Sequence, residues 1–244
     1  MEVVLITGCS SGIGLATASL LASQGYKVYA TVRDIRQAAE LKKRVRSTSA
    51  EILQIDVNTD ASVRKAVSRI LKKEKRIDVL INNAGIWGGD EALRLDRRTW
   101  DEVIETDLTG LFFVSQTVAA TMVQQRYGKI INMASTAGVM ALPHGAVYGT
   151  VKAGLMHLTK ILAVEWGPFG IRVTGIAPGL FRTDMTRDLF ADRRWSRRRQ
   201  AEIPLRRFGE PEDLVGLAIF LASRASDHIT GQTILIDGGA SLTT

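Results

Sequence analysis

Tyr148 and Lys152 stand four positions apart, and each carries a group that can hold or release a proton. In a helix this spacing places both side chains on one face, one turn apart. A phenol normally ionises at about pH 10, and a fixed ammonium group one turn away favours the phenolate. Such a pair could transfer a proton to or from a carbonyl oxygen. Because Tyr-x-x-x-Lys also arises by chance on surface helices, the surrounding elements decide whether this pair is catalytic.

A glycine-rich turn near the start of the chain predicts a phosphate site. It lies between an apolar strand at residues 3–6 and a helical pattern at residues 15–22. Glycines let the backbone approach a ligand closely, and the free N–H groups and dipole of the helix then face its negative charge. We expect the phosphates of a dinucleotide to be bound by Gly8, Ser10, Ser11, Gly12, Ile13 and Gly14. The intervening Cys9 is interpreted as a packing residue.

The end of the second expected strand, at residues 27–32, indicates which dinucleotide binds. In a dinucleotide-binding fold an acid here binds the 2′-hydroxyl of NAD, whereas a basic residue accommodates the 2′-phosphate of NADP. Arg33 follows the apolar Val32 and can pair with a phosphate or stack on adenine. The sequence therefore favours NADP(H) over NAD(H). Asp34 is expected to cap the next helix instead.

Strands and helices alternate along the rest of the chain. We expect strands at 51–55, 77–81, 129–134, 171–176 and 233–236, and helices at 35–45, 61–72, 99–123, 148–166 and 211–222. This order predicts βαβ units in a parallel sheet, within a single domain spanning residues 1–244. Ligands bind at the carboxyl ends of such strands. The polar or glycine-rich residues there are Asp56, Val57, Asn83, Ala84, Gly85, Ser135, Pro178 and Gly179.

Composition narrows the class of protein. The 45% hydrophobic content is ordinary for a folded core, and no apolar run is long enough to cross a membrane. The short apolar stretch at residues 3–6 has no basic region before it, so it does not resemble a signal peptide. We therefore expect a cytoplasmic protein that binds no membrane. The single Cys9 excludes an intrachain disulfide and a multi-cysteine metal site, and we expect no metal.

The net charge of +7 is partly concentrated in one segment. We interpret this segment mainly as a solvated helix face. Attraction of an anionic substrate or carrier is an alternative. Nucleic-acid binding is a further alternative, which we do not favour because no nucleic-acid-binding fold surrounds the cluster. The basic side chains concerned are Arg193, Arg194, Arg197, Arg198 and Arg199.

Several motifs in order along the chain give a resemblance to the short-chain dehydrogenase/reductase family over essentially its whole length. Ser135 precedes Tyr148 by 13 residues, the spacing usual in that family. The other matching residues are Thr7, Gly8, Gly12, Gly14, Asp56, Val57, Asn82 to Gly85, Lys152, Pro178, Gly179, Gly231, Gln232 and Asp237 to Gly239.

The resemblance implies a Rossmann fold, a doubly wound parallel sheet of about seven strands with helices on both faces. It also implies hydride transfer between a nicotinamide and an alcohol or carbonyl carbon. Tyr148 would be the general acid/base, Lys152 would assist it and bind the nicotinamide ribose, and Ser135 would stabilise the substrate oxygen. Cofactor contacts are implied for Asp56, Asn83, Gly85 and Thr183. A homotetramer and a substrate-covering segment at about residues 180–205 are implied as well.

Asp107 departs from the family pattern, which usually has an asparagine that supports a water in a proton relay to the lysine. The aspartate could cap a helix that begins near Leu108, and its backbone carbonyl could still hold the water. Alternatively, its carboxylate could pair with Lys152 and blunt the effect of that residue on Tyr148. We favour capping with an intact relay, and predict that Asp107→Asn keeps or raises activity.

Different parts of the sequence indicate different substrates. Residues 181–187 and 104–108 resemble the 3-oxoacyl-(acyl-carrier-protein) reductase branch, and arginines near the site would suit an acidic carrier protein or an anionic substrate. Residues 9–12 and 29–34 instead resemble steroid and retinol dehydrogenases, and the C-terminal half resembles sugar-acid dehydrogenases such as gluconate 5-dehydrogenase. A small-molecule carbonyl or alcohol is expected in each case. A non-catalytic NADP-binding redox sensor is the remaining alternative.

Overall fold

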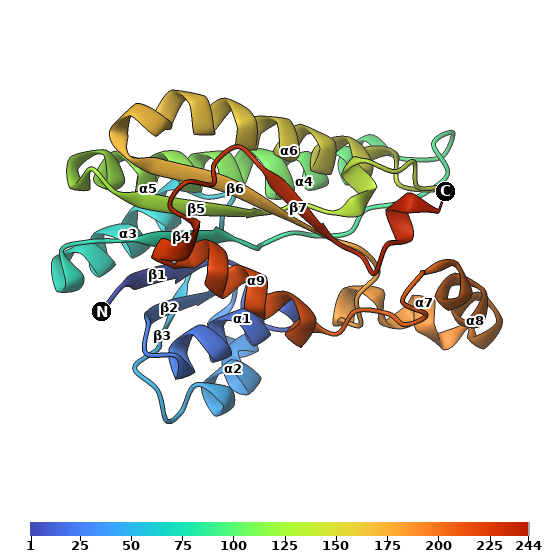
Figure 1. Cartoon of the computed structure of the whole chain (residues 1–244), viewed down its shortest axis with the longest axis horizontal. Helices are drawn as coiled ribbons and strands as arrows, with labels where there is room; N and C mark the ends of the chain where they lie inside the picture. The colour runs from blue at the N-terminus through green and yellow to red at the C-terminus, as the bar shows by residue number, and fades with distance from the viewer. Residues whose placement is uncertain (244) are drawn as a thin grey trace.

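The computed structural model describes residues 1–243, which form one seven-stranded parallel sheet in the order β3-β2-β1-β4-β5-β6-β7 (Figure 1). The expected doubly wound sheet is therefore confirmed. Expected and observed strand ends differ by no more than two residues. The strands are β1 (Val3–Ile6), β2 (Lys27–Val32), β3 (Glu51–Gln54), β4 (Val79–Asn82), β5 (Gly128–Met133), β6 (Ile171–Pro178) and β7 (Thr233–Ile236).

Helices cover both faces of the sheet because the strands are apolar on both sides (Figure 1). On one face α1 (Gly12–Ser23), α2 (Ala39–Arg44) and α9 (Pro211–Ala222) bury their apolar side chains against the strands. On the other face α3 (Asp60–Glu74), α5 (Gly110–Gln125) and α6 (Ala146–Trp166) do the same. Such two-sided burial is what requires near-continuous apolar strands in a parallel sheet.

The strand order reverses between β1 and β4, which lie side by side although β2 and β3 separate them in sequence. The chain moves outward from β1 to β3 and then returns to the opposite side of β1. In open α/β sheets this reversal leaves a crevice at the carboxyl ends of the two strands, where ligands bind. The glycine turn after β1 and the Asn83–Gly85 turn after β4 both lie at this point.

The expected helix at residues 35–45 is divided into a 3₁₀-helix, Ile35–Ala38, and α2. Asp34 caps this 3₁₀-helix as predicted, since its carboxylate accepts a hydrogen bond of 2.9 Å from the Arg36 N–H. The expected helix at 99–123 is longer than predicted. It runs from α4 (Arg97–Ile104) through a π-helical turn, η2 (Glu105–Thr109), directly into α5.

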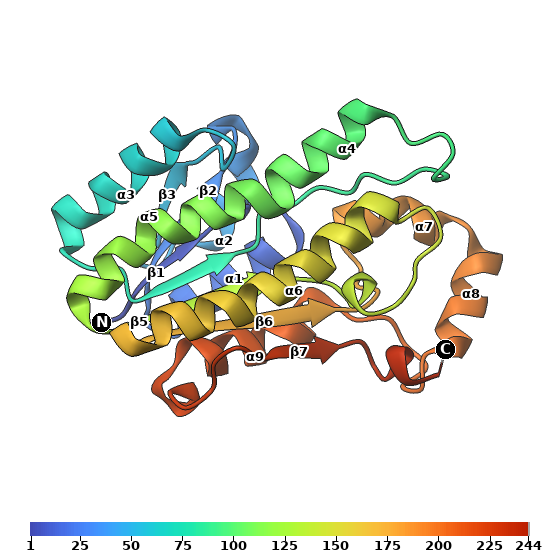
Figure 2. The ribbon, with the colours of Figure 1, turned by 90° about the horizontal axis from the view of Figure 1, so that it is seen from above.

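Residues 180–205 extend beyond the end of the sheet toward which the strands point (Figures 1 and 2). This segment contains a 3₁₀-turn (Asp184–Thr186), α7 (Arg187–Ala191) and α8 (Arg193–Glu202). Among residues 1–243, no helix is both long enough and apolar enough to span a bilayer.

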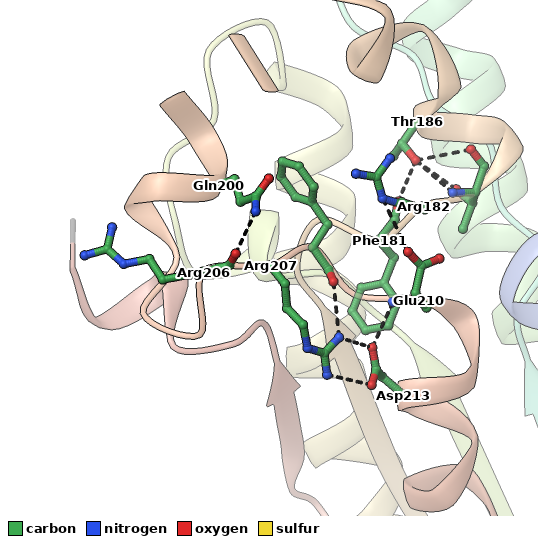
Figure 3. A network of polar contacts seen from close by, with 10 residues as sticks. Phe181, Arg182, Thr186, Gln200, Arg206, Arg207, Glu210 and Asp213 are labelled. Atoms are coloured by element: carbon green, nitrogen blue, oxygen red, sulfur yellow. Dashed lines mark hydrogen bonds and ion pairs between the residues drawn. The ribbon is translucent and has the colours of Figure 1, made fainter. Parts of the chain in front are cut away.

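A network at the base of segment 180–205 attaches it to the start of α9 (Figure 3). The Arg182 guanidinium lies 4.6 Å from the centre of the Phe190 ring and 5.2 Å from that of Phe208, and it pairs with Glu210. Arg207 holds Asp213 through two nitrogen–oxygen contacts of 2.5 and 2.8 Å, which lowers the pKa of Asp213 to about 2. The segment is therefore anchored at its base.

Candidate active site

The turn after β1 is shaped for close approach of a ligand backbone. Gly8 and Gly12 adopt φ of +70° and +56°, which residues with a side chain rarely adopt. A Cβ on Gly8 would lie 2.7 Å from Ala84 Cα, and one on Gly14 would lie 2.3 Å from the Gly8 carbonyl oxygen. Only glycine therefore fits at Gly8 and Gly14.

The N-terminus of α1 has backbone N–H groups available to bind an anion. Within residues 1–243, the Ser11 side chain makes no capping hydrogen bond there, and the first turn of α1 carries no acidic residue. Uncapped N–H groups and the positive end of the helix dipole consequently face the cleft. This donor set fits the pyrophosphate of a dinucleotide.

The turns after β1 and β4 are joined by side-chain hydrogen bonds. Thr7 Oγ1 accepts hydrogen bonds of 3.0 Å from the N–H groups of Asn83 and Ala84. The Asn83 amide donates in return to the carbonyl oxygens of Thr7 and Gly8, at 3.0 and 2.8 Å. The two turns therefore form one rigid wall of the cleft.

Arg33, which follows β2, is exposed at the edge of the same cleft. The neighbouring acid does not neutralise it, because the carboxylate of Asp34 is bound by Arg36 at 2.5 to 3.0 Å. Within residues 1–243, the Arg33 side chain has neither a hydrogen bond nor an ion pair. Its guanidinium is therefore available for an anionic group such as a 2′-phosphate.

Tyr148 and Lys152 lie one turn apart near the start of α6, as the spacing predicts. The Lys152 ammonium is buried, donates to the Met133 carbonyl oxygen at 3.1 Å, and lies 5.4 Å from the centre of the Tyr148 ring. Ser135 follows β5 and caps a short 3₁₀-turn, with its hydroxyl accepting from the Ala137 N–H at 3.2 Å. The Ser135 O–H remains able to donate to a substrate oxygen.

Asp107 does not cap a helix, so that prediction is wrong. It lies inside the π-helical turn η2, with helix on both sides, and is completely buried. Its Oδ1 accepts a hydrogen bond of 2.8 Å from the Ile86 N–H, and its Oδ2 lies 2.9 Å from Lys152 Nζ. The alternative in which the carboxylate pairs with the lysine is the one that the structure shows.

This ion pair determines the charge state of Lys152. Burial by itself would lower the pKa of the ammonium, but the Asp107 carboxylate and Tyr148 together outweigh that effect, and the pKa of Lys152 is raised. Lys152 therefore stays protonated throughout the neutral and moderately alkaline range.

One cleft of about 330 Å³ brings together all the residues for which a catalytic or cofactor role is expected. These are Gly8, Ser10 to Gly14, Arg33, Asp56, Val57, Asn83 to Gly85, Asp107, Ser135, Tyr148, Lys152, Pro178, Gly179 and Thr183. Sequence reasoning missed other lining residues, namely Gln37, Ile55, Asn58, Ile86, Thr106, Met133 and Ala134, whereas Phe181, Asp184, Met185 and Thr186 belong to the segment expected to cover the substrate. Most of these adjoin a predicted residue, so extending each motif by one or two positions would have found them.

Trp87 contacts Tyr148, which lines this cleft. Its ring lies 4.9 Å from that of Tyr148 with an interplanar angle of 57°, and the side chain is 44% exposed. A Cβ on Gly89 would lie 2.3 Å from the indole, so this glycine leaves the space that the ring occupies. The approach to Tyr148 is therefore partly aromatic.

Comparison with known proteins gives matches along nearly the whole chain. A family model described as enoyl-(acyl carrier protein) reductase matches residues 8–241. Gluconate 5-dehydrogenase of Gluconobacter oxydans is 37% identical over 240 residues, covering 98% of this chain and 94% of the relative. A 3-oxoacyl-(acyl-carrier-protein) reductase of Staphylococcus epidermidis is 39% identical over 238 residues, covering 96% and 97%.

Among solved structures, a gluconate 5-dehydrogenase from Burkholderia cenocepacia in complex with NADP and tartrate is similar to this chain. Its TM-score is 0.95 at 36% identity, covering 100% of this chain and 96% of the other.

Proposed function

This chain belongs to the short-chain dehydrogenase/reductase family, and from that premise we propose that it is an NADP(H)-dependent enzyme that interconverts a carbonyl group and a secondary alcohol. The observation that carries the proposal is the convergence of Ser135, Tyr148 and Lys152 in the cleft that also contains the uncapped glycine turn. Proton-transfer groups and a dinucleotide site in one cleft suit hydride transfer coupled to proton transfer.

In the direction of reduction, Tyr148 donates a proton to the carbonyl oxygen while Ser135 donates a hydrogen bond to the same oxygen. In the reverse direction the phenolate of Tyr148 accepts the alcohol proton. Lys152 is held by Met133 and Asp107, and its charge stabilises the phenolate. A nicotinamide bound in the cleft would supply or accept the hydride. It would be held by the glycine turn, Asp56, Asn83 and Thr183.

The preference for NADP(H) rests on Arg33. Its guanidinium lines the cleft beside β2, and Asp34, the nearest acid in sequence, is occupied by Arg36. A free cation at this position favours a 2′-phosphate over a ribose hydroxyl. The NADP in the related gluconate 5-dehydrogenase structure supports the same choice.

For the substrate we propose a 3-oxoacyl compound, delivered either free or on an acidic carrier protein. Segment 180–205, proposed here to cover the substrate, has two kinds of exposed side chain. Met185 lines the cleft, and Met185 and Leu189 are both about half exposed. On α8, Arg198 and Arg199 pair with Glu202. Within the described part of the chain, Arg193, Arg194 and Arg197 are without a carboxylate partner. An apolar wall beside free cations suits an acyl chain attached to an acidic carrier.

A sugar acid such as gluconate is the second candidate. It is favoured by the 37% identity to gluconate 5-dehydrogenase and by the similar structure that contains NADP and tartrate. The same free arginines could attract a small carboxylate substrate. Hydroxysteroids and retinoids remain weaker candidates.

The proposal is tested by following NADPH absorbance with a panel of 3-oxoacyl thioesters, and NADP⁺ reduction with gluconate. We expect turnover with at least one of them, and loss of that turnover in Tyr148→Phe. Turnover that survives this substitution would rule out the proposed mechanism.

Replacing Arg194 and Arg197 by glutamine separates the two substrates. A raised KM for a carrier-bound thioester, with the free thioester unaffected, would support delivery by a carrier. A raised KM for gluconate would support the sugar acid instead.

We also propose a homotetramer, in which the outer faces of α5 and α6 are covered by other subunits. Phe113, Ile161 and Val164 lie on these helices and are 40%, 41% and 78% exposed. Apolar side chains exposed in this way are typical of interfaces between subunits. Light scattering in solution would measure the mass of the assembly, and a monomer would contradict the proposal.

A further inference from the structure

The carboxylate of Asp107 is buried against the ammonium of Lys152, which lies 5.4 Å from the centre of the Tyr148 ring. We propose that Asp107 is a positioning residue which, by pairing with Lys152, keeps Tyr148 in its protonated form to higher pH and so extends the range in which the protein reduces carbonyls. This inference rests on the proposed function, since it assigns the proton transfer to Tyr148. It concerns the pH range of the reaction and leaves the overall equilibrium unchanged.

The contacts of Lys152 show how it is fixed. An ammonium has three N–H donors. One of them is directed to the Met133 carbonyl oxygen at 3.1 Å, and Asp107 Oδ2 lies 2.9 Å from the same nitrogen. The contact with Met133 is a hydrogen bond and the contact with Asp107 is an ion pair, so the ammonium is held from two sides. Asp107 is fixed in turn, because its Oδ1 accepts from the Ile86 N–H at 2.8 Å.

The two charges of this pair act on Tyr148 in opposite directions. The side chain of Lys152 is 5% exposed and that of Asp107 is 0% exposed, so water and salt screen neither of them effectively. An isolated ammonium beside the phenol would strongly favour the phenolate. The buried carboxylate opposes that effect, so it favours the neutral phenol over the phenolate relative to a lone ammonium.

The sign of the effect follows from the chemistry. Reduction requires the phenol, and alcohol oxidation requires the phenolate. A neutral residue at position 107 would leave the ammonium uncompensated, so the phenolate would form at lower pH. Alcohol oxidation would then become possible at lower pH, and reduction would be lost earlier as the pH rises.

Other groups near α6 do not replace this carboxylate. On β5 and the turn after it, the facing groups are the Met133 carbonyl and the Ser135 hydroxyl, which do not titrate in this range. On α4, Arg97–Asp101 and Arg98–Glu102 form exposed pairs. Glu105 on η2 is exposed, as are His157 and Lys160 further along α6. Arg172, at the start of β6, is bound at the opposite end of the sheet to the carbonyl oxygens of Gly170 and Asp227.

The test is the pH profile of Asp107→Asn, which removes the charge but keeps an oxygen that can accept from Ile86. We expect the midpoint of alcohol oxidation to fall by about one pH unit, which corresponds to a rise of about tenfold in the oxidation rate below the midpoint. Asp101→Asn is the matched control, because this carboxylate lies on α4 and is 56% exposed. It should leave the midpoint unchanged. An unchanged or raised midpoint in Asp107→Asn would overturn the proposal.

A second measurement does not depend on turnover. The ultraviolet absorbance of tyrosinate is titrated in the protein without cofactor, and the Tyr148 signal is the part that Tyr148→Phe lacks. Two of the other tyrosines should interfere little with this signal, because they ionise only at higher pH. Burial raises the pKa of Tyr26, and raises that of Tyr127 to about 12. We expect the Tyr148 signal to develop at lower pH in Asp107→Asn. If that variant does not fold, Asp107→Ser serves in its place with the same expected direction.

The two measurements separate the two proposals. A shifted tyrosinate signal without turnover on any substrate would contradict the proposed function but support the role of Asp107. Normal turnover with no shift in either measurement would support the function and overturn the role of Asp107.

Discussion

Two buried lysines lie near opposite ends of β5, and each has an aspartate oxygen 2.9 Å from its ammonium. Lys129 pairs with Asp227 near the amino end, and Lys152 pairs with Asp107 near the carboxyl end. The surroundings of the two pairs differ. The side chain of Asp227 is 33% exposed, whereas that of Asp107 is completely buried.

The pKa values of the two ammonium groups consequently shift in opposite directions. Burial lowers the pKa of Lys129, and its attraction to Asp227 only partly offsets this, with repulsion from Arg172 added. The pKa of Lys152 is raised, because its carboxylate partner and Tyr148 together outweigh the effect of burial. An identical ion-pair distance therefore does not imply an identical role. The Lys129 ammonium also binds Ser226 Oγ at 2.8 Å, which joins β5 to the turn after α9.

The largest expected contrast is in turnover. We expect Lys152→Met to reduce kcat by about 1,000-fold, because it removes the ammonium that supports proton transfer by Tyr148 and leaves the Asp107 carboxylate unopposed beside the phenol. Lys129→Met should leave kcat within about twofold, since Lys129 lies at the other end of the sheet from the cleft. NADPH absorbance measures both, with circular dichroism to confirm folding. Equal losses in the two variants would remove the functional distinction between the pairs.

The next contrast is in stability. Lys129→Met should lower the free energy of unfolding by about 2 kcal/mol, because it leaves Ser226 and Asp227 without their donor. Urea unfolding measures the loss, and Lys75→Met is the control, since Lys75 is an exposed lysine at the end of α3. An unchanged free energy of unfolding in Lys129→Met would show that its pair with Asp227 contributes nothing to the fold.

Arg33 is a third cation that can be compared with the two lysines. Within residues 1–243 its side chain has neither a hydrogen bond nor an ion pair. Arg33→Ala should raise the KM for NADPH by about tenfold and leave the KM for NADH unchanged, since one charge-assisted contact to the 2′-phosphate is lost. Arg36→Ala is the matched control, because its guanidinium is already bound to Asp34. Equal changes for both nucleotides would contradict the role of Arg33 in choosing the cofactor.

The smallest expected effect is on stability at alkaline pH, where the two lysines should have opposite signs. Because the pKa of Lys129 is lowered, the unfolded chain binds its proton more readily, and its contribution to stability rises with pH. The pKa of Lys152 is raised, so its contribution is complete below the ordinary lysine value and falls as the pH rises further.

Unfolding free energies at about pH 9 and about pH 11 measure this difference, which we expect to be about 1 kcal/mol. The gap between the natural protein and Lys129→Met should widen with pH, and the gap for Lys152→Met should narrow. Changes of the same sign in both variants would contradict the opposite pKa directions.

The sheet and the cleft were predictable because their signals are local. A short apolar strand followed by a glycine turn predicts both the strand and the residue at which it ends. The motifs after β1 and β4 therefore identified the edge of the sheet at which a ligand would bind. Neither buried ion pair has such a local signal. At Asp107 the local rule favoured a helix cap, but the partner is a lysine distant in sequence that the fold brings within 2.9 Å. Lys129 looks like an ordinary strand-edge lysine until α9 and its following turn cover it.

The π-helical turn η2 sets the rotation of α4 relative to α5, and a change of one residue in its length would alter that rotation. A π-turn holds one residue more than an α-helical turn, and each residue rotates a helix by about 100°. Deleting Thr106 would restore regular α-helix through this region and rotate either Asp107 or the helices around it by roughly that angle. The carboxylate would then leave Lys152 although every residue that makes the pair is still present. Whether the ammonium of Lys152 is paired with a carboxylate thus depends on the number of residues between α4 and α5 as well as on their identity.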